Sequence, residues 1–228
     1  PVLTTKELNY LKKINLNRIY FNFNLRHSKL YEQLRRCKKL GNLVSINIFD
    51  SKPLIFKKSI KNDWRFKNKS TLVTNNLIHY VDLVFALTGE KPLINNIHCS
   101  KINKKFNLYD SIHLTQKFKN FITNINISYA TALEKNYNFY FTNGKVEFKD
   151  DYLRIFYPAK IYDGNNRFSN PPLRKKIFIK NLFNESNYNS VKNFINLVKK
   201  QLLINKMDQV NSIYSNQFVI NLSKQIKN

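Results

Sequence analysis

The sequence has few of the residues on which specialised scaffolds depend. Its 228 residues include four glycines, two cysteines, one methionine and one tryptophan. Cys37 and Cys99 lie far apart in the chain, which excludes a disulfide-rich scaffold and gives no spacing for metal ligands, so we expect no metal site. No apolar run approaches the roughly 20 residues that a membrane helix needs. The first residues also lack the pattern of a signal peptide. We therefore expect no membrane association and a cytoplasmic location.

Acidic residues are also scarce. The 14 Asp and Glu residues stand against 39 Lys and Arg residues, which gives a net charge of +25. Such a charge is typical of proteins that bind nucleic acid. However, the basic residues are spread along the whole chain, with no run of five or more like charges. The abundance of Asn, Lys, Ile, Phe and Tyr fits an AT-rich genome. Both interpretations stay open, and the diffuse pattern favours coding bias over a nucleic-acid partner.

The apolar residues that remain are sufficient for a core, at 43% of the chain with 14% aromatic. In the first fifty residues, apolar spacing and turn residues predict alternating helices and strands. We expect a helix over 5–16 with Thr5 as its N-cap, a strand over 18–24, a helix over 27–40 that ends at Gly41, and a strand over 44–49. This order is typical of an α/β segment.

From Pro92 to about Pro158 the pattern changes to short strand-like runs separated by turn residues. These runs cover residues 93–99, 106–113, 121–129, 137–141, 146–148 and 153–157. Asn143-Gly144 predicts a hairpin between two of them. A loop over 163–172 and amphipathic helices marked by apolar positions over 188–202 and 210–218 follow. The chain as a whole predicts an α+β fold, in which an α/β piece precedes a mixed or antiparallel sheet with helices on one face.

Between these two regions, residues 70–89 predict the most informative helix. Leu72, Leu77, Val81, Val84 and Leu87 form an apolar face, and Gly89 ends the helix.

A polar pair on this helix, Asn75 and His79, lies four residues apart, so both side chains cover the same patch of surface. An amide and an imidazole aimed together can clamp a substrate and move a proton. An ordinary polar residue and a histidine satisfied by a neighbour are the structural alternatives.

Several short motifs, in order along the chain, resemble those of a known family. They are Pro1-Val-Leu-Thr-Thr-Lys-Glu-Leu, Phe23-Asn24-Leu25-Arg26, Lys39-Leu-Gly41-Asn-Leu-Val-Ser-Ile, Asp63-Trp64-Arg65, Asn75-x-x-x-His79-x-x-Asp82, and 138–148 with Gly144. Their order and spacing over nearly the whole chain resemble the Gfo/Idh/MocA family of NAD(P)-dependent oxidoreductases, especially members that act on sugars and nucleotide sugars.

The resemblance implies a domain division and a cofactor. Residues 1–40 would be the remnant of a dinucleotide-binding domain, and 41–228 would be the substrate and dimerisation domain. The glycine-rich phosphate turn of the family is absent, and the chain opens at the proline of the family's Glu-Lys-Pro motif. NAD or NADP is therefore expected in the intact parent and not in this chain alone, with an upstream dinucleotide-binding domain as a partner and a homo-oligomer formed through the sheet.

The resemblance also implies site residues. His79 would be the catalytic acid or base, and Asn75, where the family more often has Asp, would share the catalytic site and bind the substrate. Further substrate contacts are expected from Asn24, Arg26, Trp64 and Arg65.

The neighbouring Asp82 has a structural interpretation, as an orienting or ion-pairing carboxylate. The implied activity is oxidation or reduction at a secondary hydroxyl of a sugar or nucleotide sugar. The alternatives are a basic nucleic-acid-binding protein, such as an organellar ribosomal component, and a non-catalytic remnant of the oxidoreductase fold.

Overall fold

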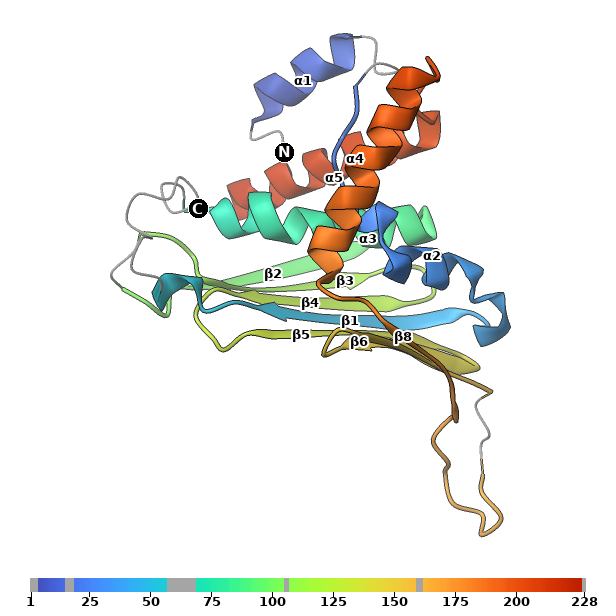
Figure 1. Ribbon diagram of the computed structural model, residues 1–228. Coiled ribbons are helices and arrows are strands. Elements are labelled where there is room, and N and C mark those ends of the chain that lie inside the picture. The colour runs from blue at the N-terminus through green and yellow to red at the C-terminus, as the bar shows by residue number, and fades with distance from the viewer. Residues whose placement is uncertain (1–3, 15–18, 57–68, 105–106, 159–161, 227–228) are drawn as a thin grey trace.

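One mixed sheet organises the molecule. The structure, a computed structural model, describes residues 4–14, 19–56, 69–104, 107–158 and 162–226. In it, eight strands lie in the order β2-β3-β4-β1-β5-β6-β7-β8 (Figure 1). The strands are β1 (Leu43–Ser51), β2 (Ile94–Ser100), β3 (Ser111–Lys117), β4 (Ile122–Ser128), β5 (Glu134–Phe141), β6 (Gly144–Lys149), β7 (Tyr152–Phe156) and β8 (Leu173–Phe178). This architecture confirms the expected α+β fold with a mixed sheet.

The strand directions place the ends of two strands at one edge. β1 and β4 run parallel, with Ser51 beside Ser128 at their carboxyl ends. The other neighbouring pairs of described strands are antiparallel. A parallel pair requires a crossover connection, and the segment that contains α3 (Ile78–Thr88) provides part of it. The carboxyl ends of parallel strands are a common position for ligand sites.

The hairpin predicted at Asn143-Gly144 is confirmed. β5 and β6 are adjacent, with Phe141 paired to Gly144. Gly144 has a φ of 156°, and a Cβ on it would lie 2.1 Å from the carbonyl oxygen of Phe156. Only glycine therefore allows β7 to approach the turn this closely.

The helices cover a single face of the sheet (Figure 1). They are α1 (Thr5–Lys13), α2 (Lys29–Arg36), α3, α4 (Leu182–Lys199) and α5 (Lys206–Gln225). Alternating residues of β1, Ile46 and Ile48, point into this face and are fully buried, as are Leu83 and Val84 of α3. Burial of each such side chain stabilises the fold by about 1.5–3 kcal/mol. Side chains from residues 23–40 pack into the same core, and the domain division at residue 40 stays a prediction.

The other face of the sheet carries a row of uncharged polar side chains. The register places Thr115, Asn124, Asn47 and Asn138 side by side on β3, β4, β1 and β5. The Asn124 amide donates to Asn47 Oδ1 over 3.1 Å, and the Thr115 hydroxyl donates to Asn124 Oδ1 over 3.2 Å. No described helix lies over this face (Figure 1). We refer to this row as the amide row.

The strand predicted over 18–24 is wrong. The described residues 19–23 have no strand partner, and Asn24–His27 form a 3₁₀ turn. Tyr20 packs on a helix instead, since its ring lies 5.2 Å from that of Phe194 and its hydroxyl donates to the carbonyl oxygen of Ser190. A strand needs a neighbouring strand edge, and helices occupy this position.

Other differences are smaller. The helix predicted over 27–40 divides into α2 and a 3₁₀ turn, Lys38–Leu40, and α1 is capped by Thr4 rather than Thr5. The run over 106–113 becomes β3, five residues later in the sequence. Strand β8 was not predicted, because its four central residues include two lysines and one arginine. No described helix is long and apolar enough to cross a membrane.

Candidate functional site

A pocket of about 440 Å³ lies at the carboxyl end of β1. Its walls come from five parts of the chain: the segment before α2, the end of β1, the start of α3, α4 and α5. The lining residues are Phe21, Asn22, Phe23, Asn24, Asp50, Lys52, Asn75, Asn76, Ile78, His79, Tyr80, Phe183, Asn187 and Asn216. The structure therefore brings together three of the predicted site residues, Asn24, Asn75 and His79. We call this cavity the β1 pocket.

The helix that carries Asn75 and His79 begins irregularly. Residues Val73–Leu77 form a π-helical segment, which continues into α3 at Ile78. Such segments are rare and occur frequently at functional sites. The hydroxyl of Tyr129, the residue after β4, donates to Asn76 Oδ1 over 2.8 Å and ties this segment to the sheet. Asn75 and His79 are both half-buried at the pocket wall.

Buried polar atoms without partners are concentrated in the β1 pocket. Among the described residues, six buried side-chain oxygen or nitrogen atoms have no hydrogen-bond partner. Four of the six belong to residues that line this pocket: Asn24 Oδ1, Asp50 Oδ1, Asp50 Oδ2 and His79 Nδ1. An unpaired buried polar group destabilises a fold by about 1–3 kcal/mol. Their concentration at one place makes the β1 pocket the candidate ligand site.

His79 is held as a neutral imidazole. Burial and, to a lesser extent, the positive charge of Lys52 lower its pKa to about 4. The ring of Phe23 meets it in an edge-to-face arrangement at 6.3 Å between centroids. A neutral imidazole has one N–H donor and one lone pair, so His79 can hold a ligand hydroxyl in either role.

The pocket also contains charged residues that sequence reasoning missed. Asp50, the penultimate residue of β1, is 1% exposed. Lys52 Nζ lies 3.4 Å from Asp50 Oδ2. The Tyr80 hydroxyl is 2.9 Å from that of Tyr137, and burial raises the pKa of both phenols. The signal in the sequence was Asp50-Ser51-Lys52, a charged pair at the end of a strand that is buried on one face.

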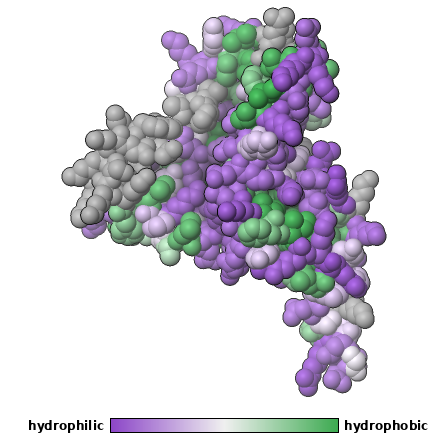
Figure 2. Space-filling view, in the orientation of Figure 1, coloured by the Kyte–Doolittle hydropathy of each residue, from purple (hydrophilic) through white to green (hydrophobic). Residues whose placement is uncertain are grey.

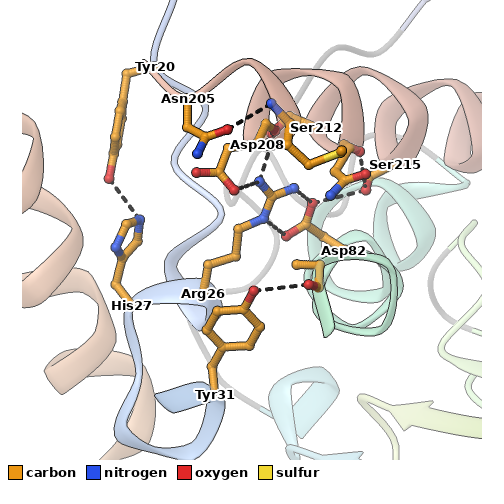
Figure 3. Close-up of polar contacts among 12 residues, drawn as sticks. Tyr20, Arg26, His27, Tyr31, Asp82, Asn205, Asp208, Ser212 and Ser215 are labelled. Carbon is orange, nitrogen blue, oxygen red and sulfur yellow. Dashed lines mark hydrogen bonds and ion pairs between the residues drawn. The ribbon is translucent and has the colours of Figure 1, made fainter. Parts of the chain in front are cut away.

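Arg26 lies apart from the β1 pocket, contrary to the prediction that it joins His79 and Asn75 there. Its Nε and Nη2 atoms donate to Asp82 Oδ2 and Oδ1 over 2.7 and 2.5 Å, and its Nη1 donates to the carbonyl oxygen of Asp208 (Figure 3). The Ser215 hydroxyl donates to Asp82 Oδ1 over 2.9 Å. The ion pair is buried, with 8% of the Arg26 side chain and none of the Asp82 side chain exposed.

This arrangement joins the 3₁₀ turn to α3 and α5, as the structural interpretation of Asp82 predicted. A different pocket, lined in part by Arg26, His27 and Tyr31, lies beside it. Burial and the nearby Arg26 charge lower the pKa of His27. Trp64 and Arg65 lie outside the described residues, so their role as substrate contacts stays a prediction.

Among the described residues, the β1 pocket contains neither a glycine-rich dinucleotide turn nor a group of metal ligands. The chain has four glycines, and none of them forms the glycine-rich turn that holds a dinucleotide pyrophosphate. Across the described ranges, no group of three or more His, Cys, Asp and Glu residues could hold a metal ion. The unpaired oxygen and nitrogen atoms instead suit an uncharged ligand with several hydroxyls.

Comparison with known proteins identifies the fold. No protein-family model matches the sequence, and no curated protein matches it. Among solved structures, an oxidoreductase from Thermotoga maritima superposes with a TM-score of 0.70 at 15% sequence identity, over 94% of this chain and 62% of that chain. The chain has the fold of Gfo/Idh/MocA-type oxidoreductases.

Two further solved structures are of enzymes whose names state their substrates. UDP-N-acetylglucosamine 3-dehydrogenase GnnA from Acidithiobacillus ferrooxidans has a TM-score of 0.69 at 14% identity, over 96% of this chain and 66% of that chain. Levoglucosan dehydrogenase, in complex with NADH and levoglucosan, has a TM-score of 0.69 at 13% identity, over 93% and 65%. The chain thus spans less than two thirds of the length of these enzymes.

Proposed function

We propose that this chain is the substrate-binding and dimerisation portion of an NAD(P)-dependent oxidoreductase that acts on a secondary hydroxyl of a sugar or nucleotide sugar. The observation that carries the proposal is the set of four unpaired buried polar atoms in the β1 pocket. The fold shared with sugar dehydrogenases supports it.

The pocket suits a sugar in size and chemistry. Its volume of about 440 Å³ lies within the range of small-molecule sites. The unpaired oxygens of Asn24 and Asp50 are acceptors, so the ligand must supply donors. A sugar ring offers hydroxyls that donate and accept in several directions. Phe23 and Phe183 add apolar surface for the ring carbons.

Three residues have proposed roles in this site. His79, neutral at pH 7, hydrogen-bonds the reacting hydroxyl and takes or returns its proton. Asn75, one turn earlier, binds a neighbouring hydroxyl, since an amide cannot act as a base. Asn24 accepts a hydrogen bond through Oδ1. A nicotinamide would exchange the hydride, and we propose that a separate dinucleotide-binding domain holds it.

An exposed apolar surface supports the presence of a further domain. On α4, Val191, Ile195 and Val198 recur at helical spacing and are 52%, 44% and 59% exposed. Figure 2 shows hydrophobic residues at the upper end of the molecule, where α1 and α4 lie. Residues that are buried by a partner domain would have this pattern.

We also propose self-association through the amide row. Asn47, Asn124 and Asn138 lie on the face of the sheet that no described helix covers. Substitution of Asn47 by lysine would place a charge at the centre of this face. Light scattering should then show a smaller assembly than for the unsubstituted chain, and an unchanged mass would contradict the proposal.

Calorimetric titration tests the sugar-binding proposal directly. UDP-N-acetylglucosamine, levoglucosan and D-glucose should be titrated into the full chain and into the His79→Gln and Asn24→Leu variants. We expect at least one ligand to bind and both variants to weaken it by at least about tenfold. His113→Gln, which changes an exposed histidine of β3, is the matched control. Absence of binding by all three ligands, or equal binding by the variants, would contradict the proposal.

The nucleic-acid and non-catalytic alternatives stay predictions, as does the cytoplasmic location. RNA binding that falls steeply with salt, in a chain that binds no sugar, would favour the first. Sugar binding without turnover in the intact parent protein would favour the second.

A further inference from the structure

Lys52 brings a positive charge to the wall of the β1 pocket. It is the single lysine or arginine among the described residues that line this pocket. Its backbone N–H donates to the carbonyl oxygen of Ser128 over 2.8 Å, which fixes the chain directly after β1. Its Nζ lies 4.9 Å from the centroid of the Phe183 ring, within the range of a cation–π contact. The ammonium group therefore lies between the Phe183 ring and the Asp50 carboxylate, on a backbone that is fixed to the end of β4.

The pairing of Asp50 with Lys52 is incomplete. Neither carboxylate oxygen has a hydrogen-bond partner of good geometry among the described residues, although Asp50 lies near enough to the Tyr80 hydroxyl to contribute to the raised pKa of that phenol. The distance of 3.4 Å from Asp50 Oδ2 to Lys52 Nζ exceeds the roughly 2.7–2.9 Å of a charge-assisted hydrogen bond. Arg26 and Asp82 show what a complete pair looks like in the same protein, with two short hydrogen bonds and a serine donor. Asp50 is as buried as Asp82 and much less satisfied.

The charges of the pair limit the ligands that can complete it. An anionic group would meet the buried Asp50 carboxylate, and a cationic group would meet Lys52. Two neighbouring hydroxyls avoid both conflicts, because one can donate to Asp50 while the oxygen of the other accepts from Lys52. Hydrogen bonds to charged groups are also the stronger ones, which makes this contact selective.

The geometry points to Asp50 and Lys52 as a recognition pair for two adjacent hydroxyls of the ligand. This inference depends on the proposed function and extends it, since it specifies that the β1 pocket recognises two adjacent hydroxyls of the sugar. A site built around hydrogen bonds to a hydroxyl strongly rejects the analogue that lacks it, because buried polar groups are then left unpaired. The pair therefore sets specificity, whereas His79 and Asn75 act at the reacting hydroxyl.

The test measures selectivity as well as affinity. NMR follows the binding of three sugars to the full chain: D-glucose, levoglucosan and N-acetyl-D-glucosamine. Each sugar is compared with analogues that lack one of its hydroxyls. In the unsubstituted protein, loss of either of two adjacent hydroxyls should weaken binding by at least about tenfold. Asp50→Asn and Lys52→Met should bind the parent sugar more weakly and should lose this discrimination.

A second strand pair with the same spacing provides the control. Lys145 Nζ lies 3.6 Å from Glu147 Oε2 on the opposite face of the sheet, so Lys145→Met and Glu147→Gln should leave selectivity unchanged. Discrimination that persists in Asp50→Asn and Lys52→Met, with both variants folded by circular dichroism, would overturn the inference alone. Binding of no sugar by the unsubstituted chain would overturn the proposed function and the inference together.

Discussion

Two polar clusters in this protein take residues from the same two elements, but one has all its hydrogen-bond partners and the other does not. Asn24 and Arg26 lie in one 3₁₀ turn, and His79 and Asp82 lie in one helix. Arg26 and Asp82 satisfy each other, with Ser215 and the backbone of Asp208 completing the cluster. Asn24 and His79, two to three residues away, keep buried atoms without partners. The first cluster finds its partners within the protein, although burial still raises the Asp82 pKa to about 6, whereas the second leaves atoms at a pocket wall that a ligand can pair.

The largest expected effect comes from breaking the complete cluster. Arg26→Met would leave the Asp82 carboxylate buried without a counter-charge, and the free energy of unfolding should fall by about 3–5 kcal/mol. Urea denaturation measures it. The double variant Arg26→Met, Asp82→Leu should recover much of the loss, because it removes the orphaned charge. A single variant that loses less than about 1 kcal/mol would show that this cluster is not structural.

The pH dependence of the free energy of unfolding tests the state of His79, which belongs to the β1 pocket. The pKa of His79 is about 4 in the folded protein and near 6.5 when unfolded, so the unfolded state binds a proton first as the pH falls. Stability should be unaffected well above pH 6.5 and should fall by about 3 kcal/mol by pH 4 from this group. His27 contributes in the same direction, since its pKa is also lowered, whereas Asp82, whose pKa burial raises to about 6, contributes in the opposite direction.

Denaturation curves of His79→Gln against the unsubstituted chain separate the two histidines. The difference in unfolding free energy between the two proteins should change across pH 6.5–4 and stay constant above that range. A constant difference at every pH would show that His79 is not held neutral by its surroundings.

The smallest expected effect is the counterpart of the first prediction. Asp50→Asn should change the free energy of unfolding by less than about 1 kcal/mol, because the asparagine oxygen can keep the contact with the Tyr80 hydroxyl and Lys52 remains 29% exposed to water. Asp82→Asn is the matched control and should destabilise the protein much more. Equal losses for the two aspartates, measured by urea denaturation, would remove the distinction between the clusters.

Local patterns in the sequence were sufficient for much of the sheet and for part of the site. Alternation and turn residues located most strands, and Asn143-Gly144 located a hairpin. Helical spacing predicted that Asn75 and His79 lie on one surface, and both residues line the β1 pocket. These features depend on residues close together in the chain, so they are visible without a structure.

Features that depend on distant partners could not be predicted. Arg26 was expected at the substrate because the sequence does not show that its counter-charge is Asp82, 56 residues later. The strand expected over 18–24 failed because its neighbours are helices from the other end of the chain. Asp50 and Lys52 belong to the pocket because β1 ends beside β4, a pairing across more than 70 residues.

The amide row has a consequence for how the molecule responds to ions in solution. Apart from Glu134 at the first position of β5, the outward-facing residues of β4, β1 and β5 around Asn124, Asn47 and Asn138 carry no formal charge, in a chain whose net charge is +25. Copies that approach through this face repel one another through charges elsewhere on their surfaces, and dissolved salt screens that repulsion. Assembly through this neutral patch would therefore tighten as ionic strength rises, the opposite of the trend for adhesion to a polyanion.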